Sequence, residues 1–146
     1  MTTWGKRVIR TTLAAGAATA LAVSLAGTAT AATPTRNGVC ETGEFCLYYG
    51  PGLTGSVSDF TTSIPTYGDH QPTCYEFKGP GLGQGKCVWR NAVSALNLTS
   101  GIVRLYTHTS CTGAERWVIR PNDSVGNLSP LANQNESQSL DPSGNC

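Results

Sequence analysis

The stretch Leu47–Gly55 reads LYYGPGLTG, and a later stretch, Leu105–Gly113, reads LYTHTSCTG. Both begin with Leu-Tyr, and both end in glycine at the same distance from the tyrosine. In a strand–turn–strand unit the aromatic ring can cover the turn, and glycine fits where φ is positive or where a side chain would collide. We therefore predict two copies of one folded hairpin, marked by Tyr48 and Gly55 and by Tyr106 and Gly113.

A second similarity follows each hairpin stretch in the same order. Residues 90–94 read RNAVS and residues 133–137 read NQNES, so that Ser94 and Ser137 take equivalent places. One unit of this size cannot bury its apolar face alone, whereas two packed units can share a core. The repeat therefore predicts a domain of two motifs, at about residues 45–98 and about residues 102–140.

The apolar residues elsewhere occur in short runs rich in Val, Ile, Tyr, Phe and Trp. Several runs alternate apolar and polar residues, such as IVRLY at 102–106 and YEFK at 75–78. Gly, Pro, Asn, Asp, Ser and Thr separate them, which is typical of many short strands joined by turns. The sequence therefore predicts an all-β fold, either a sandwich or a partly open barrel.

The first 31 residues have the pattern of a secretory signal peptide. Basic residues stand at the start, an Ala-rich apolar run follows, and Ala29–Ala31 fits the A-x-A rule for signal peptidase. We predict cleavage after Ala31, a short frayed linker at residues 32–38, and one domain at residues 39–146. We expect a secreted protein, a monomer, with no membrane contact after cleavage.

The charge of the mature chain argues against a nucleic-acid partner. The segment that we expect to be removed holds three of the ten Lys and Arg and none of the nine acids, which leaves a net charge of −2 (7 − 9). The remaining charges are scattered and form no basic stripe. A weakly acidic protein has no electrostatic reason to bind a polyanion.

All six cysteines follow the predicted cleavage point: Cys40, Cys46, Cys74, Cys87, Cys111 and Cys146. Export to an oxidising compartment favours disulfides, although the sequence alone leaves their pairing open. We favour pairs of neighbours, because the first two flank a short loop with a glycine and the next two flank KGPGLGQGK, a stretch resembling a hairpin tip. No metal site is indicated, since no C-x-x-C pair occurs and neither histidine has zinc-ligand spacing.

The opening CETGEFCLYY at residues 40–49, followed by GSVSDF at residues 55–60, resembles a family of secreted bacterial peptidase inhibitors. The two hairpin stretches resemble the folded hairpins of βγ-crystallin Greek-key motifs. The resemblance covers nearly all of the mature chain and implies a disulfide-stabilised, βγ-crystallin-like double Greek-key fold. Characterised members of the family resemble inhibitors of metallopeptidases. The resemblance therefore implies an extracellular peptidase, in particular a metalloendopeptidase, as the partner.

A disulfide-braced loop loses little entropy when it binds, so an inhibitor of this kind would present one. The first candidate is the segment with Cys87, Val88 and Trp89, where a bulky apolar residue follows a predicted disulfide, as thermolysin-like enzymes favour. The second candidate is the hairpin turn with Cys111 and Thr112. The alternative for Val88 and Trp89 is a buried strand.

The crystallin resemblance also raises the question of a calcium cofactor. Calcium-binding motifs of that kind read N/D-N/D-x-x-S/T-S, whereas residues 90–95 read RNAVSA and residues 133–138 read NQNESQ. Each differs from the pattern at two positions, and calcium needs several oxygen ligands. We therefore expect no cofactor, or weak calcium binding. The alternative role for these polar residues is to satisfy turn backbones.

The sequence offers little material for catalysis. It contains neither G-x-S-x-G nor H-E-x-x-H, and we expect its cysteines to form disulfides and its two histidines, His70 and His108, to lie in exposed loops. We therefore predict that the protein is not an enzyme. Two further classes stay open besides an inhibitor: an extracellular βγ-crystallin-like structural or binding module, and a secreted toxin or antimicrobial.

Overall fold

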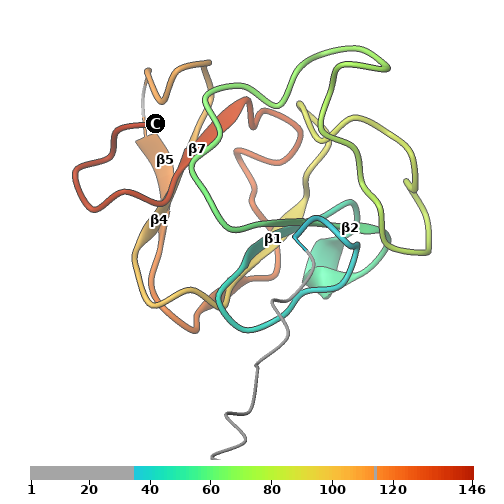
Figure 1. Cartoon of the computed structure of the whole chain (residues 1–146), viewed down its shortest axis with the longest axis horizontal. Helices are drawn as coiled ribbons and strands as arrows, with labels where there is room; N and C mark the ends of the chain where they lie inside the picture. Colours follow the sequence, from blue (N-terminus) through green and yellow to red (C-terminus); the bar gives the residue numbers. More distant parts are fainter. Residues whose placement is uncertain (1–34, 114) are drawn as a thin grey trace, which may run out of the picture. The chain divides into compact units, whose positions relative to one another are not determined.

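The chain folds into two antiparallel β-sheets (Figure 1). The computed structural model describes residues 35–113 and 115–146, so the predicted signal peptide at residues 1–31 lies outside the described residues. The first sheet has the order β2-β1-β3-β6 and comprises β1 (Phe45–Tyr48), β2 (Val57–Phe60), β3 (Ser94–Asn97) and β6 (Ser124–Val125). The second has the order β5-β4-β7 and comprises β4 (Val103–Tyr106), β5 (Glu115–Ile119) and β7 (Ser137–Ser139).

The prediction of an all-β fold is confirmed. Apart from strands, one short 3₁₀ turn, η1 (Pro51–Leu53), is present in the described part of the chain. Both sheets are open, so the fold is a sandwich and not a closed barrel. Within the same residues, no helix has the length and apolar character needed to cross a membrane.

The two halves of the chain exchange strands. β6 comes from the second half but pairs with β3 of the first half, where Ala95 lies opposite Val125. In the other direction, Ile64 of the first half forms an antiparallel bridge with Gln138 of β7, with N···O distances of 2.9 and 3.0 Å. Each sheet therefore receives a fourth segment from the other motif, which is how a pair of Greek keys closes on a shared core.

The strand registers match between the two repeats. Tyr48 of β1 lies opposite Val57 of β2 and Ser94 of β3. Tyr106 of β4 lies opposite Glu115 of β5 and Ser137 of β7. The tyrosine of each hairpin stretch thus has the serine of the later echo as its cross-strand neighbour, as expected if the two similarities in sequence mark one repeated unit.

In the first unit, a buried serine hydroxyl holds the hairpin turn. The Ser94 Oγ donates to the carbonyl oxygen of Gly50 at 2.6 Å and accepts from the N–H of Leu53 at 3.0 Å. Leu53 has φ +61° and Gly55 has φ +76°, so the chain turns sharply there. The hydroxyl supplies hydrogen bonds that the turn cannot make within itself.

The second unit repeats this arrangement with different residues. The Ser137 Oγ donates to the carbonyl oxygen of His108 at 2.6 Å and accepts from the N–H of Cys111 at 3.1 Å. Cys111 has φ +52° and Gly113 has φ +85°, which matches the first turn. Ser137 is fully buried, as is Ser94.

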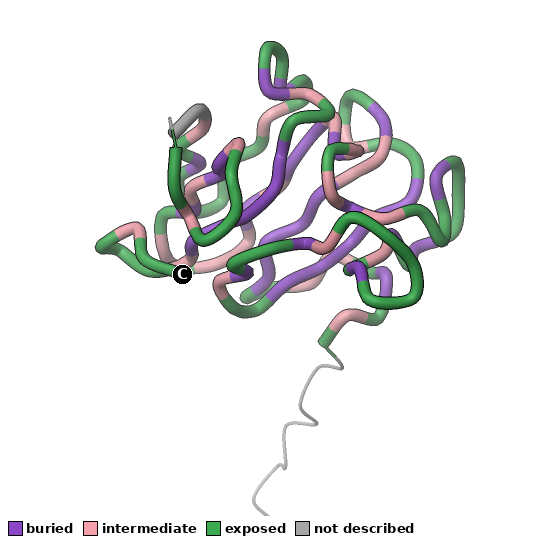
Figure 2. Tube along the Cα trace, turned by 90° about the horizontal axis from the view of Figure 1, so that it is seen from above, coloured by how far each residue is buried: buried purple, intermediate pink, exposed green. Residues whose placement is uncertain are grey.

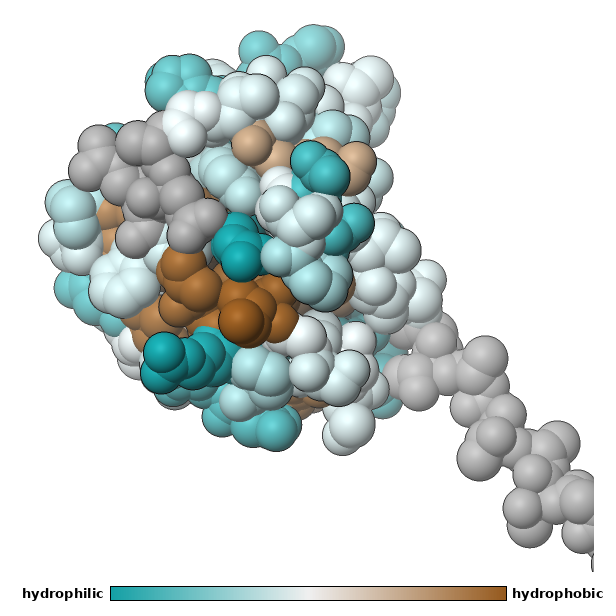
Figure 3. Space-filling view, turned by 90° about the vertical axis from the view of Figure 1, so that its left-hand side faces the viewer, coloured by the Kyte–Doolittle hydropathy of each residue, from teal (hydrophilic) through white to brown (hydrophobic). Residues whose placement is uncertain are grey.

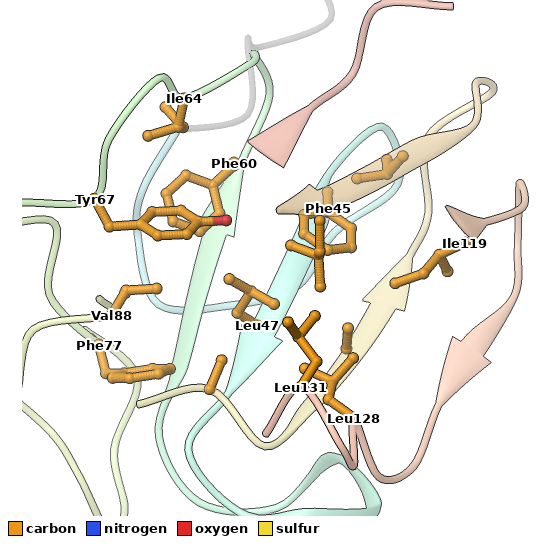
Figure 4. Packing of buried hydrophobic residues seen from close by; sticks show 14 residues of the cluster. Phe45, Leu47, Phe60, Ile64, Tyr67, Phe77, Val88, Ile119, Leu128 and Leu131 are labelled. Carbon is orange, nitrogen blue, oxygen red and sulfur yellow. The ribbon is translucent and has the colours of Figure 1, made fainter. Parts of the chain in front are cut away.

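The core lies between the two sheets. Figure 2 shows buried segments running along the strands, with exposed turns at their ends. Figure 4 shows Phe45 and Leu47 of β1, Phe60 of β2 and Ile119 of β5 directed towards this interior. Phe45 and Leu47 are two residues apart in β1, so the two-residue period of side chains in a strand sends both to the same face.

Three disulfides close the fold, and the described part of the chain holds no free cysteine: Cys40–Cys46, Cys74–Cys87 and Cys111–Cys146. These are the pairs of neighbours favoured from the sequence. The third bond joins the second hairpin turn to the C-terminal residue. Each bond therefore fixes a segment that has little regular secondary structure of its own.

Residues 35–38 are tied to the domain, so the prediction of a frayed linker is wrong for this part. The Asp59 carboxylate, fully buried in β2, accepts hydrogen bonds from the N–H groups of Asn37 and Gly38 at 2.9 and 2.8 Å. These two hydrogen bonds offset the free-energy cost of burying the Asp59 carboxylate away from water.

The side chain of Arg36 adds a second attachment. Its guanidinium carbon lies 4.6 Å from the centroid of the Phe60 ring and 4.8 Å from that of Tyr75, within the range of a cation–π interaction. One of its N–H groups also donates to the Ser58 Oγ at 2.5 Å. The ordered domain therefore begins before Val39.

Candidate functional site

The first motif carries a long irregular segment between β2 and β3. Figure 1 shows it as the green to yellow-green loops that extend away from the two sheets. Its middle part is closed by the Cys74–Cys87 disulfide and by an antiparallel bridge between Glu76 and Cys87. The second motif has no disulfide-closed counterpart among the described residues. This extra segment is the main asymmetry between the two halves.

Inside that disulfide, residues 77–86 form a hydrogen-bonded loop, which we call the braced loop. At its base, the N–H of Phe77 donates to the carbonyl oxygen of Lys86 at 2.9 Å, and the N–H of Gly85 donates to the carbonyl oxygen of Phe77 at 2.8 Å. The buried Phe77 ring anchors the base in the core. The two ends of the loop are therefore fixed by a covalent bond, by backbone hydrogen bonds and by packing.

The tip of the braced loop is a tight turn around Leu82. The N–H of Gln84 donates to the carbonyl oxygen of Gly81 at 3.2 Å, and the N–H of Ser56 donates to the carbonyl oxygen of Leu82 at 2.9 Å. The second bond ties the tip to the residue that precedes β2. The Leu82 side chain nevertheless points into solvent and is 76% exposed.

Glycine is required at the position after Leu82. Gly83 has φ +91°, and a Cβ there would lie 2.2 Å from the Cγ of the Tyr49 ring. Both the backbone conformation and the close packing on the ring exclude a side chain. The Tyr49 ring in turn packs edge-on against Phe77, with centroids 5.7 Å apart, so the tip is connected to the anchored base.

The first predicted binding segment is not available to a partner in the expected way. Val88 is fully buried, and Figure 4 shows its side chain directed into the core. The Val88 N–H also donates to the carbonyl oxygen of Tyr75 at 2.7 Å. A side chain buried in the core cannot enter a pocket of another protein. Val88 is thus buried, as in the alternative, but it lies in the irregular segment between β2 and β3 and not in a strand.

The neighbours of Val88 are partly accessible. Trp89 is half-buried, and the guanidinium carbon of Arg90 lies 4.4 Å from the centroid of its ring. Cys87 is half-buried and bonded to Cys74. The prediction placed the binding residues at the end of the disulfide-closed segment, whereas its exposed part lies in the middle.

The second predicted segment, with Cys111 and Thr112, lies at an exposed turn. Thr112 is exposed and Cys111 is half-buried. The Cys111–Cys146 disulfide and a hydrogen bond of 2.6 Å from the Ser110 N–H to the carbonyl oxygen of Pro65 hold this turn in place. It is therefore a second rigid, accessible loop, although its exposed side chains are small and polar.

Within residues 35–113 and 115–146, the two histidines are not grouped with other candidate catalytic side chains. The side chain of His70 is exposed and forms a hydrogen bond with the carboxylate of its neighbour Asp69, which lowers the pKa of that carboxyl. His108 is exposed in the second hairpin turn. Among the described residues, no three His, Cys, Asp or Glu side chains are grouped closely enough to hold a metal ion. The accessible features described above are the two rigid loops.

Leu82 was not identified from the sequence. The stretch KGPGLGQGK predicts a hairpin tip, and Leu82 is its one large apolar residue. A usable signal is present, because Leu82 stands between two glycines in a segment closed by cysteines. Glycine neighbours cannot shield it, so such a residue is exposed wherever the turn faces solvent.

Comparisons with known proteins agree with this fold. A solved structure from work on the evolution of the eye-lens βγ-crystallin domain fold matches at 12% identity, with a TM-score of 0.51, over 75% of this chain and 89% of that one. A βγ-crystallin from an archaeon matches at 17% identity, with a TM-score of 0.48, over 69% of this chain and 100% of that one. At this identity the first likeness shows the fold alone.

Two further comparisons concern the sequence. No curated protein matches the chain. A family model, described as peptidase inhibitor family I36, matches residues 33–118. The matched region includes the first hairpin, the braced loop and the second hairpin.

Proposed function

The chain belongs to peptidase inhibitor family I36, and from this membership we propose that it is an exported monomer that blocks metalloendopeptidases with the braced loop. The family makes the protein a peptidase inhibitor and not an enzyme. The peptidase class, the extracellular site of action and the inhibitory loop are the parts that we propose. One observation carries the choice of loop: residues 77–86 are exposed at their tip and fixed at their base.

Rigidity is what allows a loop to inhibit rather than to act as a substrate. A flexible peptide loses conformational freedom when it enters an active site, and each immobilised side chain costs about 0.5–1.5 kcal/mol. The braced loop is already held by the Cys74–Cys87 disulfide and by the hydrogen bond from Ser56 to Leu82. Little ordering therefore remains to oppose binding.

Two features support the other parts of the proposal. The resemblance of CETGEFCLYY, residues 40–49, to metallopeptidase inhibitors supports a metalloendopeptidase as the target. The three disulfides support a site of action outside the cell, because such bonds persist in oxidising compartments.

We expect the secreted protein to inhibit a thermolysin-like metalloendopeptidase with an inhibition constant below about 1 μM, corresponding to about −8 kcal/mol. The protein is recovered from the medium of cells that express the full chain and is titrated against that enzyme and against a subtilisin-like serine peptidase. We expect inhibition of the second enzyme to be at least about 100-fold weaker, a difference of about 2.7 kcal/mol.

A reduced and alkylated sample serves as the control and should not inhibit. Equal inhibition of both enzymes would contradict the metallopeptidase part only. The absence of inhibition of either enzyme at micromolar concentration would contradict the proposed target class and the loop mechanism together.

We also propose that calcium is not a cofactor. A calcium-binding crystallin motif begins with Asn or Asp, and Arg90 stands at that position in the first motif. Its Nε donates to the Glu136 Oε1 at 2.8 Å. A guanidinium therefore stands where an oxygen ligand would be needed, and it already pairs with the Glu136 carboxylate. We expect 5 mM calcium to change the melting temperature by less than about 1 °C relative to EDTA, because only a ligand that binds the folded state raises it. A rise of several degrees, measured by scanning calorimetry, would show that calcium does bind.

A further inference from the structure

We propose that Leu82 is the anchor of the inhibitor: its side chain enters an apolar specificity pocket of the target peptidase. This inference rests on the proposed function and names the residue and the pocket chemistry that determine the choice of target. It differs from the expectation for Val88, which is buried. The inference follows from the exposure of Leu82, its fixed backbone, its glycine neighbours and the charges at the base of the loop.

Leu82 is the most exposed large apolar side chain that the structure describes, at 76% against 54% for Val39. An isolated apolar residue on a surface is common and needs no explanation by itself. The unusual feature here is that so exposed a leucine stands at the end of a segment that is otherwise strongly fixed. Apolar anchors that fill a pocket contribute most of the binding energy of many interfaces.

The backbone of Leu82 is held while its side chain is free. Its carbonyl oxygen accepts the hydrogen bond from Ser56 at 2.9 Å, and the next residue, Gly83, packs on the Tyr49 ring. The turn hydrogen bond between Gly81 and Gln84 closes the tip. Binding would therefore immobilise little more than the leucine side chain itself, which favours affinity.

The residues beside Leu82 make the tip narrow. Gly81 and Gly83 carry no side chain, and both have positive φ, +128° and +91°. A flat strand surface could not place one side chain into a recess, because its neighbours would meet the rim first. With glycine on both sides, the leucine is the leading group and can enter a concave site.

The charges at the base of the loop indicate the rim of the pocket. Lys78 and Lys86 are both exposed, and the backbone hydrogen bond from Phe77 to Lys86 places the two ends of the braced loop side by side. Two ammonium groups behind an apolar tip suit a pocket whose floor is apolar and whose rim carries carboxylates. Such complementarity mainly raises the rate of association.

A second apolar surface provides a matched control. Figure 3 shows an apolar patch on the side of the molecule where β4 and β5 lie. The exposed large apolar residues of this region are Ile102, 37% exposed, and Val118, 47% exposed. Val118 belongs to β5 and lies opposite Arg104 of β4 in the second sheet, whereas Ser56, which holds the tip of the braced loop, adjoins β2 of the first sheet. Truncating Val118 removes exposed apolar surface without changing that loop.

The test compares four variants with the wild type against the peptidase that the wild type inhibits: Leu82→Ala, Leu82→Asp, Leu82→Met and Val118→Ala. We expect Leu82→Ala to raise the inhibition constant about 30- to 100-fold, the amount that corresponds to burying a leucine side chain. We expect Leu82→Asp to raise it further, because a carboxylate would lose its water in an apolar pocket. Leu82→Met should stay within about fivefold of wild type, since it keeps the volume and apolar character.

Each outcome supports or overturns the inference. Val118→Ala should inhibit as the wild type does, and all four variants should melt within about 2 °C of it, because exposed side chains add little stability. If Leu82→Ala and Leu82→Asp both inhibit as well as the wild type does, Leu82 is not the anchor, while the proposed function stands. If the wild type inhibits only peptidases that lack an apolar specificity pocket, the inference fails while the proposed function stands; if it inhibits no peptidase, both fail.

Discussion

Replacing Ser94 with alanine is expected to lower the free energy of unfolding by about 2–4 kcal/mol, and replacing Ser137 is expected to cost about the same. Each hydroxyl donates to one backbone carbonyl and accepts from one backbone N–H, and both serines are fully buried. Alanine would leave two backbone groups unpaired in either turn, and most of these groups are partly buried. A fully buried unpaired group costs about 1–3 kcal/mol, so two would cost about 2–6 kcal/mol; because water partly reaches these groups, we expect the lower part of that range, about 2–4 kcal/mol.

The measurement is urea unfolding of the two single variants and the double variant at neutral pH. Because the two serines share no hydrogen-bond partner, we expect the double variant to lose the sum of the single losses within about 0.5 kcal/mol. Ser100→Ala, at an exposed loop position, is the control and should change stability by less than about 0.5 kcal/mol. A loss at Ser94 without a comparable loss at Ser137 would show that the two turns are not equivalent in energy.

This repeated turn is the part of the fold that the sequence predicts best. The spacing from Tyr48 to Gly55 is matched in the second half, and Ser94 has a counterpart in Ser137 in the same order along the chain. The structure places the tyrosine and the serine of each copy on adjacent strands in matching register. The prediction works because each turn needs a positive φ, a hydroxyl and a cross-strand aromatic residue. The positive φ is a local need, and the tyrosine and the serine recur in the same order in both halves, so together they leave a pattern in one sequence.

The contacts that depend on distant segments left no such pattern. Nothing near Arg36 in the sequence indicates that its guanidinium lies on the Phe60 ring, or that the adjacent N–H groups bind the Asp59 carboxylate. The exchange of Ile64 and β6 between the sheets is equally hidden, because each consists of very few paired residues. Pairings of one or two residues are too short to show the alternation of apolar and polar residues by which a strand is identified in a sequence.

The candidate site shows the same division. The closure of a Gly-rich tip by Cys74 and Cys87 could be predicted, because paired cysteines around glycines are a local feature. The burial of Val88 and the exposure of Leu82 could not, because both depend on which side of the segment faces the core. A segment without regular secondary structure has no strand or helix period to decide that question.

The strongest link between fold and inhibition is the Cys74–Cys87 disulfide, so its removal is the second large effect that we expect. The bond spans 13 residues, for which loop-closure entropy predicts a loss of about 3 kcal/mol on reduction or replacement. We choose Cys74→Ala with Cys87→Ala, because alanine adds no polar group to the buried position of Cys74. The other two disulfides and the core stay in place, so we expect the variant to fold with a lower melting temperature.

Inhibition should fall as well, by about tenfold, because the braced loop must then be ordered when it binds. The control is Cys40→Ala with Cys46→Ala, which opens a loop of 6 residues outside the braced loop and should cost about 2 kcal/mol. Both variants are assayed at a temperature where calorimetry shows each to be folded. The control should then inhibit as the wild type does, although it has also lost a disulfide.

If the two variants lose inhibition equally, stability of the whole domain matters and local bracing does not. If neither loses any, the hydrogen bonds from Ser56 and within the turn hold Leu82 without the help of the disulfide.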